Sequence, residues 1–358
     1  MGPLGVYVHI PFCSSKCDYC AFATWTDREH LVDAYLDALR VDIEATVERV
    51  PAAVATSVFV GGGTPSLVPA AGLAAVLQVV PRHPDAEVTV ECNPETVTPE
   101  LLETYRAAGV NRLSFGVQSM VPSVLGALGR VHSPGTVDRA VAWARAAGFD
   151  SFNLDIIYGG ATESLDDWSR TLDGVLALDP PHISAYGLTV EAGTPLALDP
   201  ERQPDDDDQA DKYLLATERF AAAGLDWYEI SNWAKPGHEC RHNELYWSQG
   251  DYLAFGCAAH GHREGRRYWN VRTPDRYIDA VGARRSPVAG DEVLDPETRR
   301  IEGLQLALRT RHGVPPSALP LDDPDGPLGA LVVVRDDGRA VLTVDGRLLA
   351  NEVALRLR

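Results

Sequence analysis

Three cysteine residues near the start of the chain have the types and the spacing to hold a metal centre. Cys13, Cys17 and Cys20 follow a C-x3-C-x2-C pattern, which brings three thiolates together in one short loop. Thiolates are soft ligands that suit iron–sulfur clusters and zinc. Clusters are usually held by four cysteines. Three would leave one iron without a protein ligand, and chemistry can take place at that open position.

Two other interpretations of these cysteines compete with a cluster. Structural zinc sites are closed by four ligands, and no second pair of cysteine or histidine ligands lies near residues 13–20. Free cysteine is also a common core residue, but Pro, Ser, Lys and Asp residues flank and separate these three. The sequence therefore favours an iron–sulfur cluster over zinc and over buried thiols.

Further residues with chemical potential follow the later β-rich segments. The run Gly61-Gly62-Gly63 precedes Thr64, and glycines without side chains let a ligand approach the backbone. Four further candidates are Glu91, Gln118, Arg130 and Asp155. Taken alone, each is more often a surface or supporting residue. All four lie at or just beyond the end of a predicted strand, and this shared placement argues for function.

The segments that must position these residues form six successive pairs, each a β-rich run followed by a helical pattern. This alternation predicts an α/β fold, a parallel sheet covered by helices, and a partial (β/α)6 barrel is its natural closure. Barrel active sites form at the carboxyl ends of the strands, where the motifs above fall. The predicted strands are residues 6–10, 57–60, 87–91, 112–117, 151–157 and 182–190.

The alternation stops after about Gly224. Residues 227–269 are rich in aromatic side chains, His, Gly and Asn, and a helical run at 297–309 precedes two apolar runs joined through Asp337-Gly338, a hairpin signal. We expect three parts: a barrel over 1–225, a connecting segment over 226–290, and a small α+β, winged-helix-like domain over 291–358.

Composition excludes several classes of protein. The chain has 358 residues and a net charge of −19, which argues against nucleic-acid binding because that depends on basic patches. It contains no apolar run of about 20 residues, so direct membrane insertion is not expected. No signal peptide is evident, and six cysteines in a chain of this size do not form a disulfide framework. A reducing cytoplasm is the expected location.

The cysteine spacing, with Tyr19 before the last cysteine, resembles the signature of the radical S-adenosylmethionine (SAM) superfamily. The resemblance implies a partial barrel of that type, with a 4Fe-4S cluster on the three cysteines and SAM on its open iron. The glycine run resembles the superfamily motif that binds the SAM amino group. Further positions match the SAM-contacting set of the oxygen-independent coproporphyrinogen III oxidase family, so the implied SAM residues are Tyr7, Tyr19, Gly62, Gly63, Thr64, Glu91, Gln118, Arg130 and Asp155.

Two departures separate this chain from the oxidases of that family. Phe22 stands where an oxidase carries a fourth cysteine, and only Met1 to Gly5 precede the first strand, where an oxidase has an arm. In both respects, and in its HNxxYW run from His242 to Trp247, the chain resembles the HemW family of heme chaperones. The resemblance implies heme binding and delivery of heme to an acceptor hemoprotein, for example a respiratory one.

The HNxxYW run is implied to contact heme through His242, Asn243, Tyr246 and Trp247. A neutral imidazole can ligate heme iron, and the aromatic rings can flank the macrocycle. Without the resemblance, a histidine in an aromatic stretch is more often a hydrogen-bonded core residue, so the axial ligand stays open. Alternative iron ligands nearby in sequence are His238, Cys240, Cys257, His260 and His262.

An enzymatic function is the alternative. An oxidase of this type cleaves SAM reductively and abstracts hydrogen from the propionates of coproporphyrinogen III, which lose carbon dioxide and become vinyl groups. The cofactor does the difficult chemistry, and the protein positions the substrate. Phe22, the short amino-terminal segment and the HNxxYW run favour the chaperone.

Overall fold

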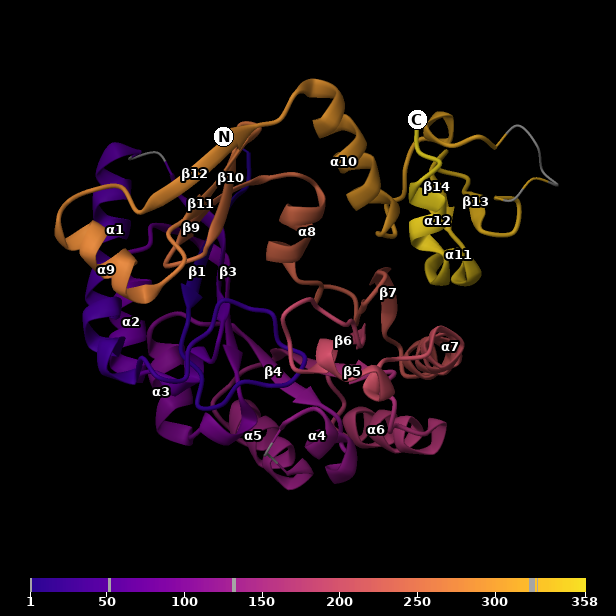
Figure 1. Ribbon diagram of the computed structural model, residues 1–358, viewed down its shortest axis with the longest axis horizontal. Helices are drawn as coiled ribbons and strands as arrows, with labels where there is room; N and C mark the ends of the chain where they lie inside the picture. The colour runs from indigo at the N-terminus through magenta and orange to yellow at the C-terminus, as the bar shows by residue number, and fades with distance from the viewer. Residues whose placement is uncertain (1, 51–52, 131–132, 322–325, 327) are drawn as a thin grey trace.

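The structure is a computed structural model, and it describes residues 2–50, 53–130, 133–321, 326 and 328–358. A strongly curved sheet of 12 strands forms its centre, and most helices cover the outer side of the curve (Figure 1). The strand order is β12-β11-β10-β9-β1-β2-β3-β4-β5-β6-β8-β7. Among the described helices, none is long and apolar enough to span a membrane.

The first six strands run parallel in sequence order, which confirms the predicted α/β partial barrel. They are β1 (Leu4–Ile10), β2 (Ala55–Gly62), β3 (Arg82–Cys92), β4 (Arg112–Gln118), β5 (Ser151–Tyr158) and β6 (His182–Gly187). The connecting helices are α1 (Val32–Arg49), α2 (Ala70–Gln78), α3 (Pro99–Ala107), α4 (Pro122–Ala127), α5 (Pro134–Ala146), α6 (Leu165–Ala177) and α7 (Asp206–Ala222).

The two faces of the barrel strands differ in polarity. On β2, the fully buried Val58 and Val60 belong to the core formed with the outer helices, whereas Ser57, Phe59 and Gly61 alternate onto the other face. The same alternation puts polar side chains on the inner face of the neighbouring strands. Buried examples are Glu87, Thr89, Ser114, Asn153, His182 and Ser184. The barrel interior is therefore polar, and its hydrogen bonds position the candidate site.

Residues 226–293 extend the sheet at both ends. The strands at one end are β7 (Asp226–Glu229) and β8 (Asn232–Ala234); those at the other are β9 (Asp251–Phe255), β10 (His260–Arg263), β11 (Arg266–Asn270) and β12 (Val288–Val293). Between them lie α8 (Arg241–Trp247) and, after β11, α9 (Pro274–Gly282). The boundaries at 225 and 290 stay predictions.

The carboxyl-terminal part has its own small core. It contains α10 (Pro296–Leu308), the hairpin β13 (Val332–Val334) and β14 (Ala340–Leu342), α11 (Val344–Leu348) and α12 (Ala350–Ala354). The hairpin turns at the predicted Asp-Gly pair. A cluster of buried residues that includes Leu308, Val314, Leu342 and Val353 is separate from the barrel core.

Candidate functional site

The loop that carries the three cysteines follows β1 directly and lies at the carboxyl ends of the strands. Cys13, Cys17 and Cys20 are partly buried and unpaired. Burial raises the pKa of the Cys13 thiol, with smaller contributions from Cys17 and Cys20, so the three sulfurs lie within electrostatic reach of one another. Thr64 Oγ1 donates to Cys13 Sγ at 3.7 Å, which ties the loop to the glycine run after β2.

No three His, Cys, Asp or Glu side chains in the described part of the chain are arranged to hold one metal ion. A cluster of several iron atoms has different requirements, because each thiolate binds a different iron. The half-buried loop, three thiols and no fourth cysteine fit such a group; Phe22, at the fourth position, is 65% exposed.

His9 anchors this loop, and the sequence analysis missed it. Its Nε2 lies 3.0 Å from the carbonyl oxygen of Ala23, beyond the third cysteine, and its Nδ1 lies 3.0 Å from the Tyr7 hydroxyl. Burial lowers the pKa of His9, so the ring is neutral. A carbonyl can only accept, so Nε2 carries the proton and Nδ1 accepts from Tyr7. One imidazole thus fixes both the loop and the direction of the tyrosine hydroxyl.

A second set of contacts holds the loop from the other side. Asp18 forms an ion pair with Arg202 at 2.9 Å, and its carbonyl accepts from the Leu196 amide at 3.0 Å. Tyr19 packs against a small apolar cluster that includes Leu188 and Leu196. The segment that follows β6 therefore holds the cysteine loop against the barrel. The residues of this segment that make the contacts could not be recognised from sequence.

The glycine run owes its composition to packing within the protein. A Cβ on Gly61 would lie 2.8 Å from Glu91 Oε2, and one on Gly62 would lie 2.3 Å from the His9 ring. A Cβ on Gly63 would lie 2.5 Å from the Phe12 carbonyl oxygen. Gly62 also has φ of +113°, which disfavours any side chain. The run therefore brings β2 close to β1 and Glu91, whether or not a ligand is bound.

Glu91 and Asp155 form a pair of carboxyl groups at the same rim. Glu91 Oε2 accepts from the Gly62 amide at 2.9 Å; Asp155 accepts from Ser114 and from Asn153, both at 2.8 Å. Desolvation, aided by the charge of Asp155, raises the pKa of Glu91 to about 7. Desolvation also raises the pKa of Asp155. Near neutral pH, Glu91 can therefore either donate or accept a hydrogen bond.

Gln118 and Arg130 meet at the end of β4. Gln118 is buried and has φ of +65°, where β4 loses its register with β5. Arg130 donates from Nη2 to the Gly116 carbonyl oxygen at 2.9 Å, and its buried Nε has no hydrogen-bond partner among the described residues. Arg130 acts electrostatically on both Tyr19 and Cys20, which places its charge beside the cysteine loop.

Tyr186 is a further residue that the sequence analysis missed. It is the last residue but one of β6, and it is 40% exposed although the four residues before it in the strand are buried. The charges of Asp155 and Glu91 contribute to raising its pKa, after desolvation. A polar aromatic side chain therefore stands at the mouth of the barrel, next to both carboxyl groups. Alternation along β6, with His182 and Ser184 on the same face, is the signal that could have found it.

The predicted heme residues lie elsewhere, on α8. His242 is fully buried, with Nδ1 2.9 Å from Ser57 Oγ and Nε2 2.8 Å from the Tyr246 hydroxyl. Asn243 and Trp247 are partly buried, and the Trp247 ring lies 5.7 Å from that of Tyr228. Ser57 is five residues before Gly62 on β2, about 16 Å along a strand. His242 therefore lies away from the cysteine loop, although the Phe59 ring stacks both on His242 and on Tyr7, one of the predicted SAM residues.

The alternative iron ligands do not form a common site among the described residues. Burial raises the pKa of the Cys240 and Cys257 thiols, to about 12 in each case. His262 is buried and bonded to the Gly250 carbonyl oxygen, whereas the exposed His260 ring stacks on Trp269. The partly buried His238 lies 3.3 Å from Ser151 Oγ.

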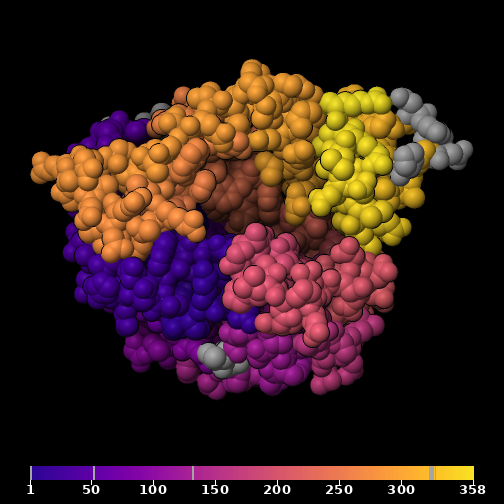
Figure 2. Space-filling view, in the orientation of Figure 1, coloured from indigo at the N-terminus to yellow at the C-terminus, as the bar shows by residue number. Residues whose placement is uncertain are grey.

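The face with the strand ends is visibly concave. Figure 2 shows a hollow between the indigo atoms of the first elements, the pink atoms of the segment around residue 200, and the orange atoms of the later chain. A small cavity close to the cysteine loop is lined by Asp18, Tyr19, Val124, Leu128, Leu188, Leu196 and Arg202, among others.

Comparison with known proteins adds independent findings. Residues 7–175 match the model of the radical SAM superfamily. The heme chaperone HemW of Mycobacterium tuberculosis H37Rv is 42% identical, over 99% of this chain and 95% of that protein. The Escherichia coli protein of the same name is 40% identical, over 72% of this chain and 70% of its own length.

A solved structure shows the same fold. Coproporphyrinogen III oxidase HemN from Escherichia coli matches with a TM-score of 0.83 at 24% identity, covering 99% of this chain and 89% of that one. At that identity the match speaks for the architecture alone. Together with the family-model match over residues 7–175, it confirms a partial barrel of the radical SAM type.

Proposed function

Because the chain belongs to the HemW family of heme chaperones within the radical SAM superfamily, we propose that it binds heme and delivers it to an acceptor hemoprotein. The observation that carries this proposal is the 42% identity to a protein named heme chaperone along 99% of the chain. We place the protein in the cytoplasm, with heme as its cargo and a hemoprotein, for example a respiratory one, as its partner.

The cysteine loop supports the assignment of a 4Fe-4S cluster to Cys13, Cys17 and Cys20. Its three thiols are partly buried, lie within electrostatic reach of one another, and lack a fourth cysteine partner. When bound, such a cluster supplies an electron and an open iron. The chain contributes the Thr64 hydroxyl to the first thiol and the His9 contact beyond the third.

The residues around the loop support SAM as the second resident cofactor. Glu91 offers a carboxyl group with a pKa of about 7, and the Tyr7 hydroxyl is directed by His9. Arg130 brings a positive charge near the cysteines, which suits the carboxylate of SAM. Gly62, Gly63, Thr64, Gln118, Asp155 and Tyr19 complete the proposed set.

An anaerobic reconstitution tests the cofactor assignment. Full-length protein reconstituted with iron and sulfide is expected to hold about four iron and four sulfide per chain, and the Cys17→Ala variant is expected to hold far less. Stoichiometric zinc without acid-labile sulfide would contradict the assignment.

A second experiment separates the chaperone from the oxidase. Reconstituted protein should bind hemin with a Soret band and should form no protoporphyrinogen from coproporphyrinogen III, SAM and a reductant. Sustained turnover of coproporphyrinogen III, without heme binding, would replace the chaperone with the enzymatic alternative.

A further inference from the structure

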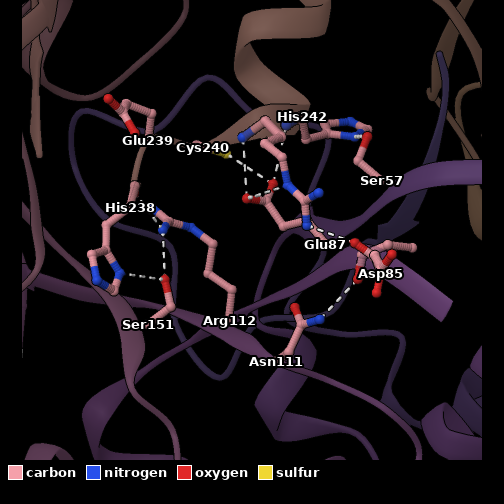
Figure 3. A network of polar contacts seen from close by, with 12 residues as sticks. Ser57, Asp85, Glu87, Asn111, Arg112, Ser151, His238, Glu239, Cys240 and His242 are labelled. Atoms are coloured by element: carbon pink, nitrogen blue, oxygen red, sulfur yellow. Dashed lines mark hydrogen bonds and ion pairs between the residues drawn. The ribbon is translucent and has the colours of Figure 1, made fainter. Parts of the chain in front are cut away.

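We propose that His242 is a positioning residue: with Ser57 and Glu87 it clamps α8 onto β2 and β3, and it supports heme binding through this clamp rather than as an iron ligand. The proposal rests on the proposed heme-binding function and deepens it, because it assigns different roles to residues of the HNxxYW run. Figure 3 shows the three residues of the clamp together.

The imidazole of His242 has no free nitrogen in this arrangement. A neutral ring offers one donor and one acceptor, and Ser57 and Tyr246 engage both, at 2.9 and 2.8 Å. Its face also stacks on Phe59, with ring centroids 5.4 Å apart and an angle of 27°. To ligate iron, His242 would have to break a hydrogen bond and leave a fully buried position.

Glu87 provides the second part of the clamp. This carboxylate is buried, yet it lies on β3, far from α8 in sequence. Its two oxygens accept from the backbone amides of Arg241 and His242, at 3.1 and 3.0 Å, and from the Cys240 thiol at 3.6 Å (Figure 3). These are the first amides of α8, which Cys240 as the N-cap does not satisfy with its own side chain.

The length of α8 makes this support necessary. The helix has seven residues, and isolated helices shorter than about 12–15 residues are marginal in water. A carboxylate at the first turn satisfies unpaired amides and complements the helix dipole. The Tyr228 hydroxyl links the start of α8 to β6. It accepts from the Cys240 amide at 3.2 Å and lies 2.6 Å from His182 Nε2.

The clamp divides the HNxxYW run into two pairs. His242 and Tyr246, four residues apart, lie on one side of the helix and are hydrogen-bonded to each other. Asn243 and Trp247, also four residues apart, form the neighbouring side and are both partly buried. We assign heme contact to this second pair, which the clamp holds in place.

Hydrogen exchange of heme-free, full-length protein tests the clamp itself. Ser57→Ala, Glu87→Gln and His242→Gln are expected to speed amide exchange in residues 241–247 by about tenfold, the effect of losing one buried hydrogen bond. Thr56→Ala is the matched control, because Thr56 is next to Ser57 on β2 but bonds to Leu4 instead. Unchanged exchange in Glu87→Gln and Ser57→Ala would overturn the clamp.

Hemin titration tests its consequence for heme. All three variants are expected to weaken binding by about five- to tenfold, while electron paramagnetic resonance of the bound ferric heme at saturation stays as in the wild type. Ser57→Ala and Glu87→Gln keep the imidazole, so they separate positioning from ligation. Loss of an imidazole signature in His242→Gln, with wild-type affinity in the other two, would make His242 a ligand and refute the proposal.

Failure of the proposed function would look different. Wild-type protein that binds no hemin would remove the chaperone function, and with it the heme part of this inference. The exchange measurement needs no heme, so it still decides whether Glu87, Ser57 and His242 hold α8.

Discussion

At the scale of single residues, the position of the cysteine loop depends on neighbouring residues outside the C-x3-C-x2-C pattern. His9 contacts Tyr7 and Ala23, and its backbone carbonyl accepts from the fully buried Tyr35 hydroxyl at 2.9 Å. The Tyr35 hydroxyl in turn accepts from the Cys257 amide at 2.9 Å. The position of the loop is therefore set by β1, α1 and the segment after β9 together.

Replacing His9 should loosen the loop without removing a thiol. His9→Ala deletes the donor to the Ala23 carbonyl oxygen and leaves a space beside Gly62, so we expect a loss of about 1–3 kcal/mol in unfolding free energy and reduced iron and sulfide content. His9→Gln keeps an N–H in a similar place and should recover part of both. Equal iron content in His9→Ala and wild type would argue that the loop holds itself.

Gly62 offers a sharper test of the close approach between strands. Gly62→Ala puts a methyl group 2.3 Å from the His9 ring at a φ of +113°, so it should destabilise the protein by more than about 2 kcal/mol. Gly126→Ala is the control, because Gly126 is in α4 with no atom within 4 Å of its new Cβ. That change should be neutral or stabilise by up to about 1 kcal/mol. Denaturant unfolding measures both.

The raised pKa of Glu91 predicts a pH dependence of stability in cofactor-free protein. Between pH 4.5 and about 7 the unfolded chain has released this proton and the folded chain keeps it, so stability falls as pH rises through that window. Glu91→Gln removes the effect and still accepts from Gly62. Its stability relative to wild type should rise by at most roughly 3 kcal/mol from pH 4.5 to 8; a constant difference would contradict the raised pKa.

What the sequence reveals at this scale is chemistry that spacing can encode. The three cysteines, the glycine run and the acidic strand ends were identified because each follows a predicted strand. His9 and the Asp18–Arg202 pair could not be, since their roles depend on contacts between segments up to 184 residues apart. The glycines also show that packing within the protein can by itself require a glycine run, because neighbouring residues fill the space beside them.

At the scale of secondary-structure elements, a short helix and a short strand are fixed by contacts with other parts of the protein. The helix α8 is fixed by strands of the barrel, and β7 is fixed by the carboxyl-terminal part. Glu229, 3% exposed at its side chain, pairs with Arg309 just after α10 at 2.8 Å. The backbone adds Ile230 N to Arg309 O at 3.1 Å and Arg311 N to Tyr228 O at 2.9 Å. The small domain is therefore attached to the open end of the sheet.

Removing Arg309 should weaken this attachment. Arg309→Ala leaves a buried carboxylate with only the Ser231 amide and the Asn232 side chain as donors, at an expected cost of about 1–3 kcal/mol. The control is Arg300→Ala on α10, whose contacts with Glu297 and with the Arg358 carbonyl oxygen are both exposed, with an expected change within about 0.5 kcal/mol. Urea unfolding of both variants measures the difference, and equal effects would argue against a specific attachment.

The elements that the sequence predicted are those with strong periodicity. The six βα units and the Asp-Gly hairpin were recovered because buried strands and amphipathic helices have distinct patterns. The strands β7–β12 were not recognised, because they are short, and β12 is largely exposed and carries Asp291 and Glu292. Their place in the sheet is set by pairing with β1 and β6, which no local pattern reveals.

At the scale of the whole molecule, β1 is an interior strand of the sheet. It pairs in parallel with β2 on one side and with β9 on the other. The predicted division at residue 225 would remove β9 and α8, which both contact β1. The barrel is therefore expected to need the middle of the chain for stability, although its six βα units end earlier.

Two truncations test this expectation. A fragment of residues 1–225 should show no cooperative thermal unfolding and little bound iron after reconstitution, because it exposes the edge of β1 and the polar interior. A fragment of residues 1–294 keeps every strand of the large sheet and should fold, with lower stability from the loss of Arg309. A stable, iron-binding 1–225 fragment would establish the barrel as an independent domain.

The pairing of β1 with β9 also has a consequence for synthesis. Leu4 pairs with Asp251, so 251 − 4 = 247 positions separate the two. At about 5–20 residues per second, the ribosome needs roughly 12 to 50 seconds to reach β9 after β1 has emerged. During that interval one edge of β1, the strand that precedes the cysteine loop, has no neighbouring strand to pair with. Iron loading that requires the finished barrel must then follow translation of more than two thirds of the polypeptide.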